Sequence, residues 1–429
     1  MIDIKLIREN PELVKENIKK KFQNDKLALV DKIIKLDEEW RKLKYKEDGL
    51  RSERNKISKE ISEAKKVKKS VAALLKKARE IPDEIEKLDE KKGKLEEQIK
   101  ELMMVIPNII DKSVPIGKDD SQNVELKKFG KPEVPSYEIL HHAKLAEKNE
   151  WADFDSARET SGNGFYYLTG DLALLHSALL AFARDYMVSQ GFSYVIPPFM
   201  IRRKVVEGVM SFKEMDAMMY KIDGEDLYLI GTSEHSMIGR FIDKTISGKK
   251  IPLLLTSYSS CFRKEVGSHG IDEKGLYRVH QFEKQEMIVI CEPEDSYKWY
   301  DKMWKYSVEI FEKLNIPVRT LECCSGDLAD LKAKSVDVEA WSPRQKKYFE
   351  VGSCSNLTDA QARRLNIRIE GRGKIYFAHT LNNTVLASPR ALIAFLENNQ
   401  QKDGSIKIPT VLQSYMGGKK FIGKNEKNK

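Results

Sequence analysis

Apolar residues in the N-terminal quarter recur alternately three and four positions apart, in two consecutive runs. The first run extends from Leu29 to Ala64 and the second from Val71 to Ile106. This spacing is the seam of a coiled coil, so two runs joined by a short basic stretch predict an antiparallel helical hairpin over about residues 27–104. At 1.5 Å per residue, an arm of ~36 residues reaches on the order of 54 Å, which suits contact with a large partner.

Polar residues interrupt this seam at Glu47, Arg54 and Lys92. Folding the hairpin about residues 67–68 brings Glu47 to within one turn of Lys92, so the two are predicted to pair. A polar pair at this place costs stability but helps to fix the register of the two helices. Pro82 lies inside the returning helix and is expected to bend it or loosen that turn.

The rest of the chain divides by composition. Residues 1–22 predict a short amphipathic helix in which Asn10-Pro11 starts a second segment, so residues 1–106 form one helical domain. Residues 107–135 are rich in Pro and Gly and predict a linker with short extended pieces. Residues 136–429 alternate apolar strand-like runs with helical segments, without regular strand–helix–strand units, and end in a basic tail. The predicted fold class is therefore α+β: a helical hairpin followed by an antiparallel sheet with helices.

Five strand-like runs carry this expectation. They are Phe165–Leu168, Leu227–Ile230, Ile251–Leu255, Met287–Ile290 and Ile375–Ala378.

Composition narrows the class of protein. The 429 residues carry a net charge of +9, and no apolar stretch approaches the ~20 residues that span a bilayer. The N-terminus has no apolar signal region, and the five cysteines form no CxxC pair. We therefore expect a cytoplasmic protein with reduced cysteines, no membrane association and no zinc.

Positive charge is concentrated toward the tip of the arm. Residues 41–79 hold 15 Lys and Arg against 5 Asp and Glu, whereas residues 80–104 hold 5 against 9. A solvated coiled-coil surface and a footprint for nucleic-acid phosphates explain this charge equally well. Few aromatic residues interleave the basic ones, so an RNA partner would be recognised by shape and backbone. The candidate RNA-binding residues are Arg41, Arg51, Arg54, Lys65, Lys66, Lys68, Lys69, Lys76 and Lys77.

Candidate chemistry begins at Arg263-Lys264-Glu265. A glycine-bearing loop, 266–276, follows and leads to a second apolar segment, Tyr277–Met287. This order predicts two paired strands joined by a mobile loop that covers a substrate. Taken alone, Arg263 and Glu265 are equally typical of a surface ion pair.

Five segments together resemble the seryl-tRNA synthetases, which are class II aminoacyl-tRNA synthetases of the standard, non-zinc type. Arg263–Glu265 with Arg278–Phe282 resembles motif 2, Gly191–Phe199 resembles motif 1, and Leu386–Leu392 resembles motif 3. Gly231–Glu234 is similar to the serine-binding TxE loop, and Glu350–Asn356 to the E-V-S-S-C-S-N segment. The resemblance covers essentially the whole chain, the arm included.

The resemblance implies that L-serine and ATP form seryl-adenylate and pyrophosphate, and that serine then passes to the 3′ end of tRNA(Ser), held by the arm. It also implies a homodimer and Mg²⁺ bound with ATP by Glu350 and Ser353. The implied catalytic residues are Arg263, Arg390 and Glu350. The implied ATP-binding residues are Arg263, Lys264, Glu265, Val279, Phe282, Glu350, Val351, Gly352, Ser353 and Arg390.

Within this set, Arg263 is suited to bridge the α-phosphate and the serine carboxylate, because a planar guanidinium binds oxyanions bidentately. By resemblance, Glu265 accepts a hydrogen bond from the adenine amino group and Phe282 stacks on the ring. Arg390 clamps the γ-phosphate from the first turn of a helix for which Ser388 is the expected N-cap.

The implied serine-binding residues are Thr232, Ser233, Glu234, Arg263, Glu286 and Thr384. Glu286 and Thr384 take the hydroxyl, while Thr232 and Glu234 hold the ammonium. Alone, Glu286 is more typical of a buried ion pair and Thr384 of an ordinary strand residue. Gly352 stands where the family usually has serine. His280 and His379 are assigned to structure, since adenylation requires no obvious base.

Two other classes of protein remain in view. A paralogue that loads a carrier protein would be expected to lack the arm, which this chain has. A coiled-coil adaptor without activity would be expected to lose Arg263, Glu265, Glu350 or Arg390, and all four are present. A zinc-dependent seryl enzyme is disfavoured because the serine segments offer no Cys/His/Glu ligand trio.

Overall fold

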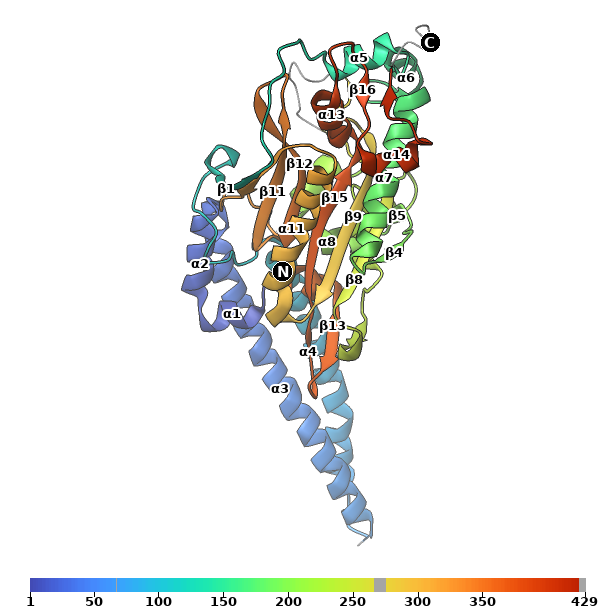
Figure 1. Cartoon of the computed structure of the whole chain (residues 1–429). Coiled ribbons are helices and arrows are strands. Elements are labelled where there is room, and N and C mark those ends of the chain that lie inside the picture. Colours follow the sequence, from blue (N-terminus) through green and yellow to red (C-terminus); the bar gives the residue numbers. More distant parts are fainter. Residues whose placement is uncertain (67, 266–274, 424–429) are drawn as a thin grey trace. The chain divides into compact units, whose positions relative to one another are not determined.

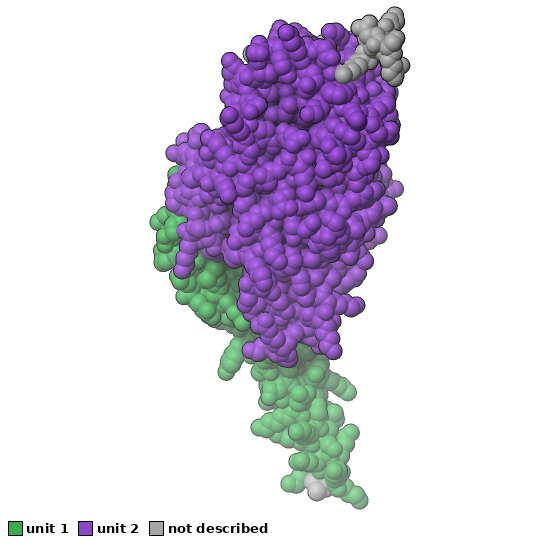
Figure 2. All heavy atoms as spheres, viewed as in Figure 1, with its two compact units in different colours: residues 1–107 green, residues 108–429 purple. Residues whose placement is uncertain are grey.

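The computed structural model describes residues 1–66, 68–265 and 275–423. It divides into two compact units, residues 1–107 and residues 108–429, which are coloured separately in Figure 2.

The first unit is entirely helical (Figure 1). Asn10 ends the first helix and caps the second, since its side chain accepts a hydrogen bond from the Leu13 amide at 3.2 Å and Pro11 is the first helical residue. Two long helices of 40 and 34 residues then run against each other, so the predicted hairpin is confirmed. The elements are α1 (Ile4–Glu9), α2 (Pro11–Lys20), α3 (Leu27–Lys66) and α4 (Ala72–Val105).

The seam of the arm is apolar near its middle and charged closer to its base. Ile57, Ile81 and Ile85 form a buried cluster between α3 and α4. The predicted pairing of Glu47 with Lys92 is confirmed, because the Lys92 ammonium donates to the buried Glu47 carboxylate. The helix α4 continues through Pro82, and the expected bend at that residue stays a prediction.

The second unit is built on an eight-stranded sheet with the order β1-β10-β11-β12-β15-β9-β8-β4 (Figure 1). Neighbouring strands are antiparallel, except that β4 pairs with β8 in parallel. The strands are β1 (Val124–Phe129), β4 (Ser193–Val195), β8 (Leu253–Phe262), β9 (Gln281–Cys291), β10 (Val318–Glu322), β11 (Lys334–Ser342), β12 (Lys347–Asn356) and β15 (His379–Ala387). The predicted α+β class is confirmed.

Smaller sheets, ten α-helices and several short 3-10 helices complete the described part of this unit. The short strands are β2 (Ala152–Asp153), β3 (Tyr167–Leu168), β5 (Met200–Ile201), β6 (Tyr228–Leu229), β7 (Thr245–Ser247), β13 (Arg368–Gly371), β14 (Lys374–Phe377), β16 (Ile406–Lys407) and β17 (Phe421–Ile422). The helices are α5 (His142–Lys148), α6 (Phe154–Ser161), α7 (Gly170–Ser189), α8 (Arg203–Val209), α9 (Phe212–Met218), α10 (Ser233–Gly239), α11 (Ser296–Lys313), α12 (Ala360–Leu365), α13 (Ser388–Asn399) and α14 (Thr410–Gln413).

The central strand β9 has a buried core on each face. Met287 and Val289 belong to the larger apolar cluster, to which α7, α11 and α13 also contribute residues. Ile288 and Ile290 belong to a second apolar cluster, to which α10 and α12 contribute residues. Since side chains alternate along a strand, the even-numbered residues of β9 before Ile288 face the same side as the second cluster. That side holds the candidate site.

Of the segment 107–135, which the sequence pattern predicts as a linker, all residues from 108 onward belong to the second unit. It supplies the edge strand β1, which pairs with β10. Five of the six residues of β1 are exposed, so no burial pattern marks the strand in the sequence. Across the described residues, no helix is both long and apolar enough to cross a membrane.

Candidate active site

A cavity of about 320 Å³ lies on the second-cluster side of the sheet. It is bounded by β9, β12, β15, the end of β8 and the first turns of α10 and α13. Most of the residues proposed from the sequence line it: Thr232, Glu234, Arg263, Glu265, Val279, Phe282, Glu286, Glu350, Val351, Gly352, Ser353, Thr384 and Arg390.

Two proposed residues, Ser233 and Lys264, are outside this lining. The Ser233 side chain is buried and accepts a hydrogen bond from the Ser257 hydroxyl at 2.6 Å. Lys264 contacts its surroundings through the backbone, where its N–H donates to the Met218 carbonyl at 2.9 Å. Of the proposed covering loop, 266–276, residues 266–274 lie outside the described residues.

Two irregularities in strand pairing aim side chains at the cavity. Glu350 and Ser353 are three residues apart, so in a regular strand they would point to opposite faces. The register of β12 against β11 shifts between these two residues, leaving Val351 as the extra residue of a β-bulge. A second shift follows Thr384 in β15, where Thr384 pairs directly with Glu286 of β9. The bulges therefore gather residues that simple alternation would separate.

One end of the cavity is built around Glu286, whose side chain is 2% exposed. The Thr232 hydroxyl donates to this carboxylate at 3.0 Å, and the Lys284 ammonium forms an ion pair with it. Lys284 is two residues before Glu286 on β9, so the same alternation brings both to the cavity. The Glu286 carboxylate is thus fixed in place, with Thr384 beside it in the next strand.

Glu234 provides a second carboxylate at this end. The Gln361 side-chain amide donates to it at 2.7 Å. Burial and the neighbouring Glu286 raise the pKa of Glu234 to about 7, well above the ordinary value of a glutamate. Lys284 neutralises one of these two carboxylates, so the pair favours one further cation.

Another part of the cavity wall is formed by Arg263 and the apolar side chains beside it. The Arg263 Nε donates to the Gly231 carbonyl at 3.2 Å, and its guanidinium lies 5.3 Å from the centre of the Phe282 ring. Phe282 and Val279 belong to a small buried cluster with Cys261. This arrangement offers a planar cation next to a flat apolar wall.

Arg390 lies in the first turn of α13. Its Nη1 donates to the Glu350 carboxylate at 2.8 Å and to the Glu350 carbonyl at 3.1 Å, and its guanidinium lies 5.1 Å from the Tyr277 ring centre. Burial alone would lower the pKa of Arg390, but Glu350 and Tyr277 more than offset this and raise it. The side chain is therefore a permanent cation held at the cavity wall.

The expectation that Ser388 is the N-cap of this helix is wrong. The helix begins at Ser388, so Ala387 is the cap. The Ser388 hydroxyl is used elsewhere, because it accepts a hydrogen bond from the Glu283 amide at 3.3 Å. Arg390 stays in the first turn despite this shift of one residue.

Glu350 and Ser353 present a carboxylate and a hydroxyl to the cavity. Such hard oxygen donors fit Mg²⁺, which prefers one or two protein ligands completed by phosphates and water. Asp337 pairs with Ser353 across the strands and accepts a hydrogen bond from its hydroxyl. Burial and the charge of Glu350 raise the pKa of Asp337.

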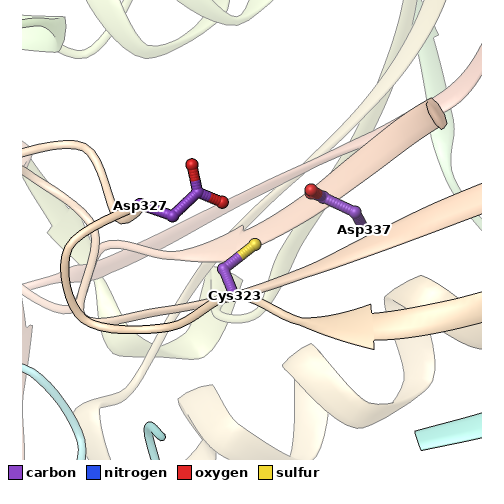
Figure 3. Close-up of side chains that lie close together, drawn as sticks. All are labelled: Cys323, Asp327 and Asp337. Carbon is purple, nitrogen blue, oxygen red and sulfur yellow. The ribbon is translucent and has the colours of Figure 1, made fainter. Parts of the chain in front are cut away.

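Within the described ranges, one group of side chains has the composition of a metal site. The ligand atoms of Cys323, Asp327 and Asp337 lie within 4.8 Å of one another, and the thiol points toward both carboxylates in Figure 3. Burial raises the pKa of the Cys323 thiol far above its ordinary value, so the thiol is neutral in the metal-free protein. The three residues are outside the described lining of the cavity.

Sequence reasoning missed several residues of the cavity wall, among them Lys284, Lys332 and His235. The period-2 alternation with Phe282 and Glu286 could have identified Lys284. Lys332 lies in a loop without a pattern. Burial would lower the pKa of its ammonium, but Cys323, Asp337, Glu214 and Glu350 raise it.

The nine basic residues proposed for the arm are all exposed. Three of them take part in ion pairs within the arm: Arg41 with Asp37, Arg51 with Glu47 and Asp89, and Lys77 with Glu53. Lys65, Lys66, Lys68 and Lys69 lie at the turn between α3 and α4.

Comparison with known proteins identifies the family. The model of the seryl-tRNA synthetase N-terminal domain matches residues 1–110, and that of the tRNA synthetase class II core domain (G, H, P, S and T) matches residues 218–399. The serine–tRNA ligase of Methanospirillum hungatei is 44% identical, over 98% of this chain and all of its own. The chain belongs to the seryl-tRNA synthetase family.

Solved structures of this family agree with the fold. The seryl-tRNA synthetase of Pyrococcus horikoshii, complexed with ATP, has a TM-score of 0.92 and 43% identity, covering 98% of this chain and 99% of its own. The cytoplasmic serine–tRNA ligase of Naegleria fowleri, in complex with AMP, has a TM-score of 0.88 and 32% identity, covering 98% of each chain. The resemblance drawn from the sequence motifs is thus confirmed.

Proposed function

We propose that this seryl-tRNA synthetase family member uses the cavity to form seryl-adenylate and pyrophosphate from L-serine and ATP, and then passes serine to the 3′-terminal adenosine of tRNA(Ser). The observation that carries the proposal is the joint lining of one cavity by two arginines and two buried glutamates, contributed by Arg263, Arg390, Glu234 and Glu286. Phosphates and an ammonium are the groups that such residues bind.

Adenylation requires the serine carboxylate to attack the α-phosphorus of ATP while pyrophosphate leaves. Arg263 holds both oxyanions, because its planar fork of donors spans a carboxylate and a phosphate and offsets the charge that builds up between them. Phe282 and Val279 provide the flat wall for adenine, and Glu265 accepts from its amino group. Arg390 holds the γ-phosphate and thereby orients the leaving group.

Serine is recognised at the Glu286 end of the cavity. Glu286 accepts the hydrogen bond of the serine hydroxyl, and Thr384, directly opposite in the sheet, limits the space around it. Alanine and glycine would leave the buried Glu286 without this partner, which makes their activation unfavourable. Glu234 and the Thr232 hydroxyl receive the ammonium group.

Mg²⁺ would be held by Glu350 and Ser353 together with ATP. When bound, it would supply charge neutralisation at the phosphates. Arg390 binds the Glu350 carboxylate at 2.8 Å and so keeps this ligand directed along the cavity wall.

The arm supplies the tRNA-binding element in this proposal. Its exposed lysines at the turn, Lys65, Lys66, Lys68 and Lys69, offer positive charge to an RNA backbone. A homodimer is proposed through the segment that resembles motif 1. Tyr194 and Ile196 of this segment are 38% and 74% exposed, and the next residue after it, Met200, is 48% exposed, which gives an apolar surface suited to a second copy. The free, buried cysteines fit a cytoplasmic site of action.

ATP–pyrophosphate exchange with a panel of amino acids tests the proposal. We expect exchange with serine, and much weaker exchange with alanine, glycine and threonine. Exchange that is strongest with alanine or glycine, or no exchange with serine, would overturn it.

A further inference from the structure

We infer that His280 is a positioning residue for Arg263: its imidazole and its backbone together hold the Arg263 backbone at the point where the strand pair ends. This inference rests on the proposed role of Arg263 at the α-phosphate. His280 itself is outside the described lining of the cavity, so it acts through Arg263.

The pairing of β8 with β9 ends at Phe262 and Gln281. Arg263 and His280 are the next residue on each strand, and they continue the ladder by one hydrogen bond, from the Arg263 amide to the His280 carbonyl at 2.9 Å. The His280 ring supplies a second bond, since its Nδ1 lies 3.0 Å from the Arg263 carbonyl. Both backbone polar groups of Arg263 are thus held by one residue.

A hydrogen bond at this second contact requires a proton on Nδ1. A carbonyl oxygen only accepts, so Nδ1 must be the donor. The Tyr220 hydroxyl lies 3.1 Å from the same nitrogen and shares this donor as an acceptor. The neutral Nδ1–H tautomer and the imidazolium both donate from Nδ1, so the contact with Arg263 persists in either protonation state.

Residues 164–165, which belong to a separate segment of the chain, also contact His280. The Gly164 carbonyl accepts from the His280 amide at 2.9 Å, and the Phe165 ring centre lies 5.4 Å from that of His280. A Cβ on Gly164 would lie 2.6 Å from the imidazole Cδ2, and Gly164 also has a φ of +79°. Glycine at this position therefore lets the ring approach the backbone closely.

The consequence for the site is geometric. From its fixed backbone, the Arg263 side chain reaches the Gly231 carbonyl at 3.2 Å and lies over Phe282. A small displacement of that backbone would move the guanidinium away from both the phosphate and the carboxylate. Misplacement by about 1 Å is enough to cost on the order of 100-fold in rate.

Substitutions at His280 test the inference by placing a hydrogen-bond donor either at the position of Nδ1 or away from it. In His280→Asn the amide nitrogen replaces Nδ1, whereas in His280→Gln it lies nearer the position of Nε2. In ATP–pyrophosphate exchange we expect kcat/KM for serine to fall about 10- to 100-fold in His280→Ala and His280→Gln, and His280→Asn to recover to within about threefold of the natural protein.

Three results would overturn the inference: equal activity in the Asn and Gln variants, full activity in the Ala variant, or a pH inflection of the natural protein that His280→Asn removes. The last result would make His280 a titrating catalytic residue. Should His280→Ala fail to fold, the comparison of Asn with Gln still decides.

A matched control is His379→Ala. The His379 Nδ1 lies 3.0 Å from the Ser296 hydroxyl and the residue is outside the described cavity lining, so kcat/KM should stay within about twofold. Absence of serine exchange in the natural protein would contradict the proposed function instead, which separates the two failures.

Discussion

A glutamate in the arm and a glutamate in the cavity have opposite electrostatic surroundings. In the arm, Glu47 receives hydrogen bonds from Lys92 and from Arg51, the latter at 2.6 Å, and the Lys92 bond lowers its pKa. In the cavity, burial and the like charge of Glu286 raise the pKa of Glu234 to about 7. The carboxylate of the arm is satisfied by the protein itself, while that of the cavity is arranged for a cation.

The surroundings of a carboxylate therefore distinguish one that stabilises the fold from one that binds a ligand, without reference to any sequence motif. A network in which every carboxylate is paired with a basic side chain fixes the register of two helices. Because its hydrogen bonds are already made, it binds a further ligand only weakly. Carboxylates that face each other in a closed space lower their energy by taking up an ammonium or a proton. The same reasoning applies to arginine: Arg51 belongs to the arm network, and Arg263 faces the cavity.

Replacing one arginine from each unit gives the largest expected contrast. In Arg263→Ala the α-phosphate and the serine carboxylate lose their shared cation, so kcat/KM for serine-dependent exchange should fall roughly 1,000-fold. The matched variant Arg51→Ala removes an equally charged side chain and should leave exchange within about twofold. Comparable losses in both variants would show that the contrast between the units is wrong.

The raised pKa of Glu234 predicts a pH effect of intermediate size. The carboxylate binds the serine ammonium only when ionised, and a pKa of about 7 means that ionisation is lost as the pH falls through 7. The KM for serine should therefore rise about tenfold between pH 8 and pH 6. Steady-state exchange at saturating ATP measures this directly.

Glu234→Gln provides the control for this effect. The amide cannot ionise, so the variant should bind serine more weakly at every pH and show a flat dependence over the same range. A slope that persists in Glu234→Gln would assign the titration to another group.

The smallest functional effect is expected for the arm network. Glu47→Ala leaves Lys92 without its main partner and should reduce the stability of the hairpin by about 1.5–3 kcal/mol, with exchange unchanged. Replacing both Glu47 and Lys92 by leucine should restore stability, since a packed apolar pair avoids the desolvation cost. Thermal unfolding followed by circular dichroism compares the variants, and a stable single mutant would mean that the pair does not hold the register.

The arm was predictable in detail because its structure follows one periodicity. The 3/4 spacing places each seam residue, and the length of the turn then fixes which residues meet, so the contact between Glu47 and Lys92 follows from counting. The exposed edge strand β1 has no such pattern because neither of its faces is buried. The composition of its segment therefore predicts a linker.

Only those cavity residues that belong to recognisable sequence motifs were predictable. The proposed residues include Glu350, Ser353 and Thr384, yet the sequence does not reveal that two β-bulges direct these side chains to the cavity, because a bulge has no fixed sequence signal. Lys284 follows from strand alternation with Glu286. Lys332 depends on how a loop folds back over the sheet, which local sequence does not determine.

Shortening the arm while keeping its tip tests the central claim, that the cavity activates serine and the arm serves only the transfer to tRNA. Removing residues 51–64 together with 75–88 takes two heptads from each helix in register, since Glu47 faces Lys92 and Arg51 faces Asp89. The turn and its lysines are kept, and the arm loses about 21 Å of reach.

Serine-dependent ATP–pyrophosphate exchange and seryl-tRNA formation are then measured on the same preparation. We expect exchange within about twofold of the unshortened chain and a loss of seryl-tRNA formation of at least about 100-fold. Transfer that survives the shortening, or exchange that falls together with transfer, would contradict it.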